Sequence, residues 1–167
     1  MKKLLLVRHA KAEKISPNQK DFDRELANRG LMDAPRIAQT IYNEGIVPQL
    51  LVSSPAVRAI STAFYFAEQF KIDTTAILQN EDIFEASPGA LLKIVNQFSD
   101  EVEFIAMFGH NPGFSYLAEY LTGYDIGEIP TCGAVLLHFE VESWSHISQN
   151  TGTLHQHWYP AQVTGDK

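Results

Sequence analysis

The sequence contains a single cysteine, Cys132, among 167 residues, so no disulfide can form within the chain. Such sparse cysteine usage is typical of proteins from reducing compartments, and we expect a cytoplasmic protein. The sequence also has no apolar run near the ~20 residues that a membrane-spanning helix needs, so we expect no membrane association. The opening Met1-Lys2-Lys3 is similar to the start of a signal peptide. However, the apolar stretch behind it already ends at Arg8, which is too early for a signal peptide.

Positive charge is also scarce, with 13 Lys and Arg against 20 Asp and Glu, a net charge of -7 at pH 7. Proteins that bind nucleic acids usually carry a basic face, so we expect no nucleic-acid partner, although a small basic pocket remains compatible with this charge. Repeats, low-complexity tracts and linker-like stretches are missing too. The sequence therefore predicts one domain over residues 1–160, with a frayed tail at residues 161–167.

Short apolar segments alternate with amphipathic ones along most of the chain. Strands are expected at residues 4–7, 50–52, 77–78 and 104–108, and helices at residues 31–41, 55–70, 88–98 and 112–121. Such alternation is typical of a three-layer α/β/α fold with a mainly parallel central sheet. Residues 134–141 and 153–158 predict an antiparallel pair near the end of the chain. The polar stretch 11–28 predicts a long loop, and loops of this length are often functional.

Three of the predicted helices begin with the same sequence pattern, a capping residue followed by a proline at the first helical position. The pairs are Ser54-Pro55, Ser87-Pro88 and Asn111-Pro112. The apolar stripes of the first two helices include Leu31 and Phe64, and we expect both side chains in the core.

Cationic or imidazole side chains follow three of the predicted strands. Arg8 and His9 end the first strand, and Arg58 lies in the first helical turn after the second. His110 follows the strand at 104–108. Because carboxyl ends of parallel strands share one edge of a sheet, we expect these side chains to meet there. Two arginines, two histidines and nearby helix starts predict a site for a compact anion, above all phosphate.

Binding a phosphate would not by itself require two histidines. A neutral imidazole is a competent nucleophile toward phosphorus at pH 7, and nearby arginines favour the neutral form. The same arginines would stabilise the charge of a transferring phosphoryl group. No cluster with metal-ligand spacing accompanies them, so we expect neither a metal nor another cofactor.

The motifs that carry these residues resemble those of the histidine phosphatase superfamily, also called phosphoglycerate mutase-like. They are Arg8-His9-Ala10, the stretch Ser53-Ser54-Pro55-Ala56-Val57-Arg58-Ala59, and Gly109-His110-Asn111-Pro112. Three further stretches, at residues 21–30, 84–88 and 130–134, are similar to motifs of the short SixA-like phosphohistidine phosphatase branch. The first of them matches D-x-x-R-P-L-x-x-R-G, except that Glu25 replaces the proline. The resemblance extends over nearly the whole chain and implies a phosphoglycerate mutase-like fold without a large lid insertion.

The resemblance also implies a role for each matching residue. His9 would be the nucleophile that carries the phosphoryl group, while Arg8, Arg58 and His110 would bind its oxygens. Ala10 stands where the superfamily more often has glycine, a change that this branch accepts. Arg24 would be either a cation at the rim of the pocket or an anchor of its loop.

Larger members of the superfamily use a mid-chain glutamate as general acid, and Glu85 is the best match. Glu81 and Asp82 are nearby competitors. An alkoxide leaving group needs a proton as it departs, whereas a departing imidazole, whose conjugate acid has a pKa of about 6.5, needs less help. The structural alternative is that Glu85 caps the helix that follows it.

Other polar residues have simpler interpretations. His155 and His157 share one face of a predicted strand without a third metal ligand, which predicts an exposed surface. Cys132 lacks the loop that a cysteine phosphatase needs and should pack as a small apolar side chain. Asp21 and Asp23 are predicted to be solvated loop charges.

Taken together, the patterns and the resemblance predict a metal-independent phosphatase that forms a covalent phosphohistidine. The resemblance further implies that it acts on a phosphohistidine-bearing carrier protein. Two alternatives remain at this stage. One is a small-molecule phosphomonoesterase of the same superfamily. The other is a non-catalytic module that binds phosphate or a phosphoprotein through the same cations.

Overall fold

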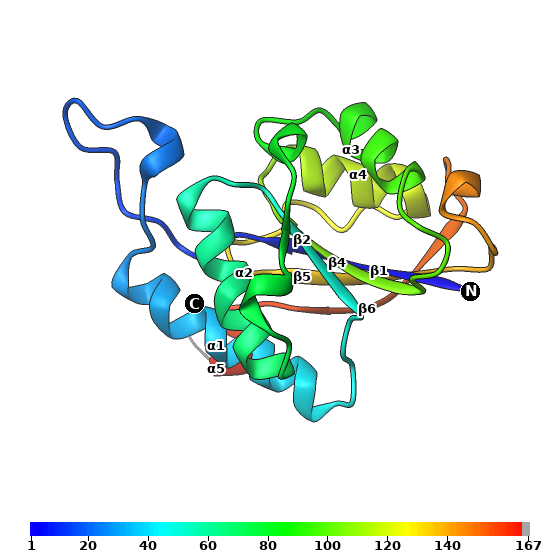
Figure 1. Ribbon diagram of the computed structural model, residues 1–167, viewed down its shortest axis with the longest axis horizontal. Coiled ribbons are helices and arrows are strands. Elements are labelled where there is room, and N and C mark those ends of the chain that lie inside the picture. Colours follow the sequence, from blue (N-terminus) through cyan, green and yellow to red (C-terminus); the bar gives the residue numbers. More distant parts are fainter. Residues whose placement is uncertain (165–167) are drawn as a thin grey trace.

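Six strands form one sheet in the order β3-β2-β4-β1-β5-β6 in the computed structural model, which describes residues 1–164 (Figure 1). The strands are β1 (Lys2–Arg8), β2 (Leu50–Ser53), β3 (Leu78–Gln79), β4 (Phe104–Gly109), β5 (Ala134–Phe139) and β6 (Gly152–Trp158). The pairs β1–β4, β2–β4 and β2–β3 are parallel, whereas β1–β5 and β5–β6 are antiparallel. The expected mainly parallel sheet and the expected antiparallel pairing of β5 with β6 are confirmed, and β5 also pairs antiparallel with β1.

Strand β1 occupies the centre of the sheet, between β4 and β5, and its apolar residues are inaccessible to solvent. Leu5 lies opposite Ala106 on one side and Leu136 on the other. Leu4 and Leu6 belong to the core on one face of the sheet, and Leu5 and Val7 belong to the core on the other. A strand covered on both faces has no polar side, which explains its continuous apolar run.

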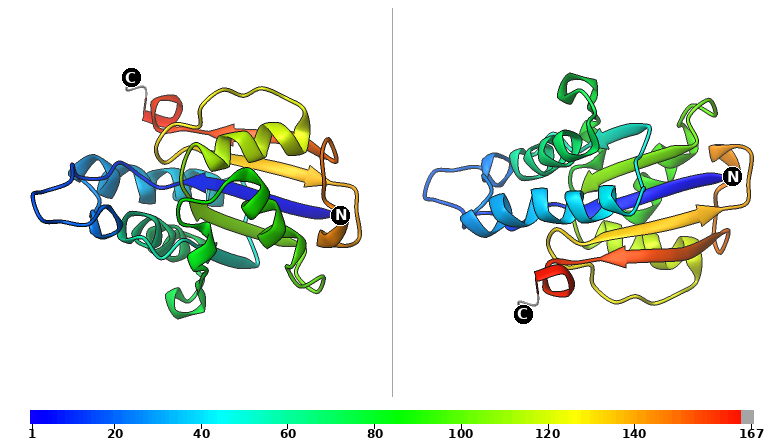
Figure 2. Two further views of the ribbon diagram at one scale, coloured as in Figure 1. Left: turned by 90° about the horizontal axis from the view of Figure 1, so that it is seen from above. Right: turned by 90° about the horizontal axis from the view of Figure 1, so that it is seen from below.

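Helices cover both faces of the sheet and complete the three layers (Figures 1 and 2). Helices α1 (Asn28–Asn43), α2 (Val57–Phe70) and α5 (Pro160–Thr164) lie on one face. Helices α3 (Pro88–Asn96) and α4 (Gly113–Thr122) lie on the other. In the described residues, no helix is long and apolar enough to cross a membrane.

The predicted helix starts are correct for α3 and wrong for α2 and α4. Ser87 caps α3, because its Oγ accepts the backbone N–H of Ala90 at 3.1 Å. Helix α2 begins at Val57, since Ser54 Oγ instead accepts the N–H of Ala56 within the preceding turn. Helix α4 begins at Gly113 after a cis Asn111-Pro112 peptide, with Pro112 as the N-cap.

Two side chains expected in the core are exposed instead. Leu31 and Phe64 each keep 42% of their surface accessible. In α2 the buried stripe includes Ala63, Phe66 and Phe70, so the predicted Phe70 is in the core and Phe64 lies outside the stripe. The helix packs against both the sheet and α1, which buries this stripe and leaves Phe64 pointing outward.

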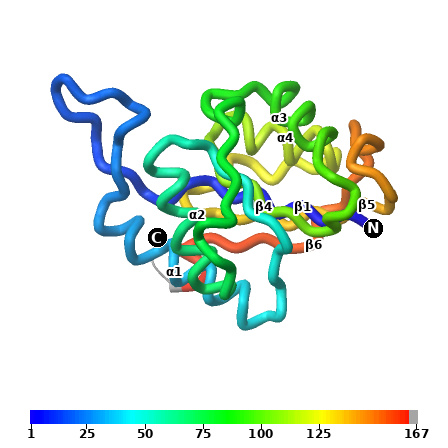
Figure 3. The backbone as a smooth tube through the Cα atoms, in the orientation of Figure 1, coloured from blue at the N-terminus to red at the C-terminus, as the bar shows by residue number. Residues whose placement is uncertain are grey.

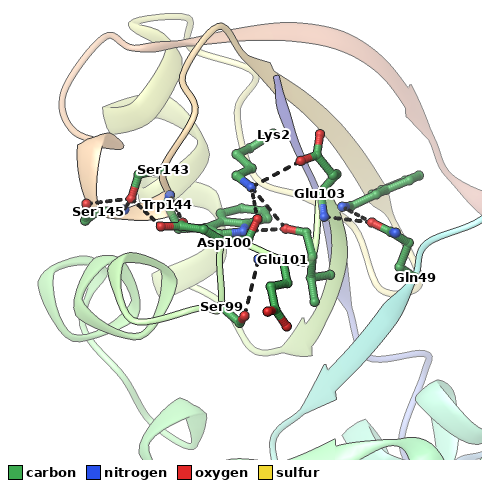
Figure 4. A network of polar contacts seen from close by, with 11 residues as sticks. Lys2, Gln49, Ser99, Asp100, Glu101, Glu103, Ser143, Trp144 and Ser145 are labelled. Carbon is green, nitrogen blue, oxygen red and sulfur yellow. Dashed lines mark hydrogen bonds and ion pairs between the residues drawn. The ribbon is translucent and has the colours of Figure 1, made fainter.

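At the amino end of β1, the buried Lys2 ties three segments together (Figure 4). Its Nζ donates to the carbonyl of Asp100 at 2.7 Å and lies 3.5 Å from a carboxylate oxygen of Glu103. Trp144 packs beside it and donates its indole N–H to the carbonyl of Val102. This network anchors the end of the sheet opposite to Arg8 and His9.

The end of the chain differs in detail from the sequence expectation. Strand β5 ends at Phe139, two residues earlier than expected, and a short 3-10 helix at Trp144–His146 lies between β5 and β6. The segment for which a frayed tail is expected continues α5 as far as Thr164, and Val163 packs against the core. Residues 165–167 of that tail lie outside the described residues.

A long excursion that we call the arm, residues 11–27, leaves the end of β1 and returns to the start of α1 (Figure 3). Its two limbs are joined near the base by an antiparallel bridge between Ala12 and Leu26. A 3-10 turn, η1 (Asp21–Asp23), lies on the returning limb. The predicted long loop is therefore hydrogen bonded at its base and carries one helical turn.

Candidate active site

The structure brings Arg8, His9, Arg58 and His110 together at the carboxyl edge of the sheet. All four line one pocket of about 250 Å³. The remaining lining residues come from the arm and from two other loops: Lys11, Ala12, Arg24, Asn111 and Thr131. His9 and His110, which are 101 positions apart in the sequence, thus line one small pocket, as the strand-end pattern predicted.

Strand register explains why the two histidines are neighbours. Arg8 lies opposite Gly109 in the parallel pair β1–β4, so His9 and His110 each follow the last paired residue. The backbone N–H of His9 donates to the carbonyl of Gly109 at 3.0 Å. Their rings lie 5.4 Å apart, centre to centre, and are tilted by 53°.

The ring of His9 is buried and oriented by a single hydrogen bond. Its Nδ1 lies 2.8 Å from the carbonyl oxygen of Ala10, an atom that can only accept. Nδ1 must therefore carry the proton, which leaves the lone pair of a neutral ring on Nε2. Burial, opposed by that hydrogen bond and assisted by the charges of Arg58 and Arg8, lowers the pKa of His9 to about 4. His9 is consequently neutral at pH 7, in the tautomer that a nucleophilic Nε2 requires.

His110 has the complementary arrangement. Its Nε2 lies 2.8 Å from Ser54 Oγ, which already accepts the N–H of Ala56. The Ser54 hydroxyl can donate to Nε2, and in that tautomer a neutral His110 carries its proton on Nδ1. Burial, with the charges of His9 and Arg58, lowers the pKa of His110 to about 3. With its proton on Nδ1, His110 offers an uncharged N–H donor in the pocket that His9 also lines.

Arg58 is the most buried cation of the pocket, and it has a carboxylate partner that the sequence interpretation missed. Its Nη2 donates to Asp21 Oδ2 at 2.9 Å and its Nη1 to the backbone carbonyl of Asp21 at 2.7 Å. Asp21 is a half-exposed loop charge, as predicted, but the prediction missed its ion pair with Arg58, a buried guanidinium that needs a counter-charge. The sequence did indicate that a buried Arg58 would need a carboxylate partner. It does not show which of the chain's carboxylates is that partner.

Arg8 is held from the other side of the pocket. Its Nη1 donates to the carbonyl of Ile129 at 2.8 Å and lies 3.4 Å from a carboxylate oxygen of Glu128. Burial lowers the pKa of Arg8 despite the charge of Glu128. Even so, a guanidinium remains charged at pH 7.

Hydrogen-bond donors without partners concentrate in this pocket. Within residues 1–164, four buried side-chain nitrogen or oxygen atoms lack a hydrogen-bond partner. Three of them belong to pocket residues, namely Arg8 Nε, Arg58 Nε and His110 Nδ1. Buried polar atoms are nearly always paired, so three such donors around one small space indicate a ligand rich in acceptor oxygens. A phosphoryl group has this character.

Glu85 does not belong to this lining. Its side chain is exposed, and its backbone adopts a left-handed conformation with φ of 57°. The alternative that Glu85 caps α3 is wrong, because Ser87 performs that role. The competitors Glu81 and Asp82 are exposed on a neighbouring 3-10 turn. The assignment of Glu85 as general acid stays a prediction.

Cys132, His155 and His157 lie as the sequence predicted, the first buried and the other two exposed. Cys132 is fully buried, and burial raises the pKa of its thiol. Its backbone N–H contacts the carbonyls of Arg8 and His9, so it stabilises the end of β1 through the main chain. His155 and His157 are exposed on β6. In the described part of the chain, no three His, Cys, Asp or Glu side chains are grouped as around a metal ion.

A larger groove of about 530 Å³ adjoins the pocket and shares Arg8 and Asn111 with it. Helix α4 and the loop after it supply its other walls, including the exposed Tyr116. The pocket therefore has room beside it for the rest of a phosphorylated molecule.

Comparison with known proteins agrees with this geometry. The family model for the histidine phosphatase superfamily (branch 1) matches residues 4–92. An uncharacterised chloroplast protein of Arabidopsis thaliana is 30% identical over 159 residues, covering 90% of this chain and 72% of that protein. The sequence match to the Arabidopsis protein extends well past the motif that carries Arg8 and His9.

Solved structures show the same fold. SixA from Agrobacterium tumefaciens, described as a candidate phosphohistidine phosphatase, has a TM-score of 0.81 and 27% identity, covering 95% of this chain and 98% of its own. The protein histidine phosphatase SixA complexed with tungstate has a TM-score of 0.83 and 16% identity, covering 97% and 99%, a likeness of fold alone. The chain belongs to the histidine phosphatase superfamily (branch 1), with a phosphoglycerate mutase-like fold.

Proposed function

We propose that this protein is a phosphatase that transfers a phosphoryl group to His9 and then to water, and that its substrate is a phosphohistidine-bearing protein. The observation that carries the proposal is the geometry of the pocket. His9 Nδ1 contacts the Ala10 carbonyl, which leaves the lone pair on Nε2, and Arg8, Arg58 and His110 line the same pocket. The low pKa of His9 agrees with a neutral ring at pH 7. Family membership supports the phosphatase class.

In the first step, the Nε2 lone pair of His9 attacks phosphorus and forms a P–N bond. The bond to the leaving group breaks in line with the attack, and its electron pair stays with the leaving group. Arg8, Arg58 and the Nδ1–H of His110 donate to the three equatorial oxygens. Their unpartnered donors are in place before the substrate arrives, so little reorganisation is needed.

In the second step, water attacks the phosphohistidine. A new P–O bond forms, the P–N bond breaks, and the pair returns to Nε2 of His9. Orthophosphate and one proton are the products. The low pKa of His9 helps this step, because a weakly basic imidazole is a good leaving group.

A phosphohistidine substrate fits the leaving-group chemistry of this pocket. A departing imidazole needs less help from a proton donor than a departing alkoxide does. Among the described residues, those that line the pocket include no carboxylate that could donate such a proton. The adjoining groove leaves room for the surface of a carrier protein. The SixA relatives, named as phosphohistidine or protein histidine phosphatases, support the same substrate class.

The covalent step can be tested with a phosphohistidine carrier labelled with radioactive phosphate, quenched in alkali, where P–N bonds survive. We expect label on the wild-type enzyme and none on His9→Ala. His155→Ala removes an exposed histidine of β6 and should label normally. Turnover by His9→Ala at the wild-type rate would refute the mechanism. Tight phosphate binding by the wild type without label or turnover would identify a binding module instead.

A second comparison separates the substrate classes. Wild type and Glu85→Gln are assayed on the phosphohistidine carrier and on small phosphate esters. If the leaving-group argument holds, Glu85→Gln retains phosphohistidine activity and loses ester activity. Equal losses on both would refute it, and wild-type activity on esters alone would favour a phosphomonoesterase.

A further inference from the structure

Asp21, on the arm, contacts Arg58 through two different oxygens. The backbone carbonyl accepts from Nη1 at 2.7 Å, and the carboxylate Oδ2 accepts from Nη2 at 2.9 Å. The Arg58 side chain is 6% exposed, while Asp21 is 51% exposed. The arm therefore brings its own acceptors to an arginine that is nearly buried in the pocket.

The pattern of these contacts determines which edge of the guanidinium remains available. A guanidinium has one fork at its end, formed by Nη1 and Nη2, and another along its side, formed by Nε and one terminal nitrogen. Asp21 occupies the end fork. Nε, on the side fork, is buried without a partner. Two parallel N–H groups on that side match two oxygens of a phosphoryl group.

The same carboxylate also orients a second guanidinium, that of Arg24 on the arm. Oδ1 of Asp21 accepts from Arg24 Nε at 2.9 Å, and Arg24 Nη1 donates to the carbonyl of Glu13. Burial would raise the pKa of Asp21, but the charges and hydrogen bonds of Arg58 and Arg24 outweigh it and lower that pKa. Asp21 is therefore an anion at neutral pH, with one oxygen for each arginine.

An aromatic contact fixes the arm in this position. Phe22, the next residue, packs edge-on against Phe84 at 5.3 Å between ring centres. Phe84 in turn lies under the Arg58 guanidinium at 5.9 Å and edge-on to His110 at 5.4 Å. The segment that carries Asp21 thus packs against the same ring as two residues of the pocket, which gives Asp21 a defined place.

We propose that Asp21 is a positioning residue, which holds the end fork of Arg58 so that its side fork faces the transferring phosphoryl group. Asp21 itself does not line the pocket and acts through Arg58 and Arg24. This inference rests on the proposed phosphoryl transfer for its effect on rate. Its effect on the geometry of Arg58 is independent of that transfer.

The test compares Asp21→Asn with Asp23→Asn. Both remove one negative charge from the same 3-10 turn, but Asp23 has an exposed side chain with no contact to Arg58. For Asp21→Asn, we expect kcat to fall about 10- to 100-fold, because the phosphoryl donors lose their alignment. KM should change by less than about threefold, since removing a carboxylate does not weaken attraction for an anion. Asp23→Asn should keep both constants, and Asp21→Glu should recover part of the lost kcat.

A second readout does not need turnover. The Nε–H resonance of Arg58, identified by its loss in Arg58→Lys, is followed by NMR during titration with inorganic phosphate. We expect a large shift on saturation in wild type and Asp23→Asn, and a reduced shift in Asp21→Asn. Circular dichroism and thermal unfolding establish that each variant is folded.

The outcomes separate this inference from the proposed function. If the wild type turns over no phosphorylated substrate but the resonance behaves as described, phosphoryl transfer fails and the positioning role stands. If Asp21→Asn leaves kcat and the resonance shift unchanged, the positioning role is wrong, whatever the activity. A loss of thermal stability in Asp21→Asn with unchanged kcat would also overturn it, because Asp21 would then only stabilise the arm.

Discussion

Folding stability should decrease steeply between pH 8 and pH 5 because two buried histidines cannot accept protons in the folded state. The pKa of His9 is lowered to about 4 and that of His110 to about 3, chiefly by burial. In the unfolded chain both should titrate near pH 6.5. Below that pH the unfolded state binds more protons than the folded state, so acid favours unfolding.

The size of the effect follows from this difference. At pH 5 each unfolded histidine is almost fully protonated while its folded counterpart is not, which costs about 2 kcal/mol of stability per histidine relative to pH 8. The two together therefore cost roughly 4 kcal/mol, a large part of the stability of a typical domain. The loss continues to grow until the pH approaches the folded pKa values of about 4 and about 3.

Urea denaturation followed by tryptophan fluorescence at several pH values measures this loss. His9→Asn removes one titrating group and should roughly halve the decrease between pH 8 and pH 5. The control is His157→Gln, which changes an exposed histidine on β6 and should leave the decrease as in the wild type. If His9→Asn has the same pH dependence as the wild type, His9 is not held neutral by the pocket and the reasoning fails.

Three further predictions concern other parts of the molecule. The kcat/KM of the proposed reaction should not fall through protonation of His9 between pH 8 and pH 5, because its pKa is about 4; an NMR titration of His9 with a midpoint near 6.5 would contradict this. Lys2→Met should lower the free energy of unfolding by about 1–3 kcal/mol, since the carbonyl of Asp100 loses its donor; calorimetry without a decrease would show that the Lys2 network is dispensable. Gly30→Ala should cost about 1–3 kcal/mol, because a Cβ there would overlap the carbonyl of Lys11 at the base of the arm, and an unchanged melting temperature would contradict that packing.

The architecture was largely predictable because its determinants are local. Continuous apolar runs predict strands buried on both faces, and alternation with amphipathic helices predicts parallel pairing. The errors occurred where packing decides. Phe64 is exposed because the face of α2 that packs inward carries Ala63, Phe66 and Phe70. The capping pattern at Ser54 is used within a turn, since its hydroxyl contacts Ala56 and His110.

The sequence by itself determined which cationic and imidazole side chains the chain carries and at which edge of the sheet they lie. The four side chains lie at or just beyond the ends of short strands: Arg8 and His9 after the first, Arg58 after the second, and His110 after the fourth. Because parallel strands end at the same edge of a sheet, these side chains lie at one edge. Only the tertiary structure decided the protonation state, the tautomer and the ion pairs of these side chains. The neutral state of His9 depends on burial, and its tautomer depends on the orientation of its ring toward the Ala10 carbonyl. The pairing of Arg58 with Asp21 arises because the arm places Asp21 beside Arg58, a long-range contact that no local pattern specifies.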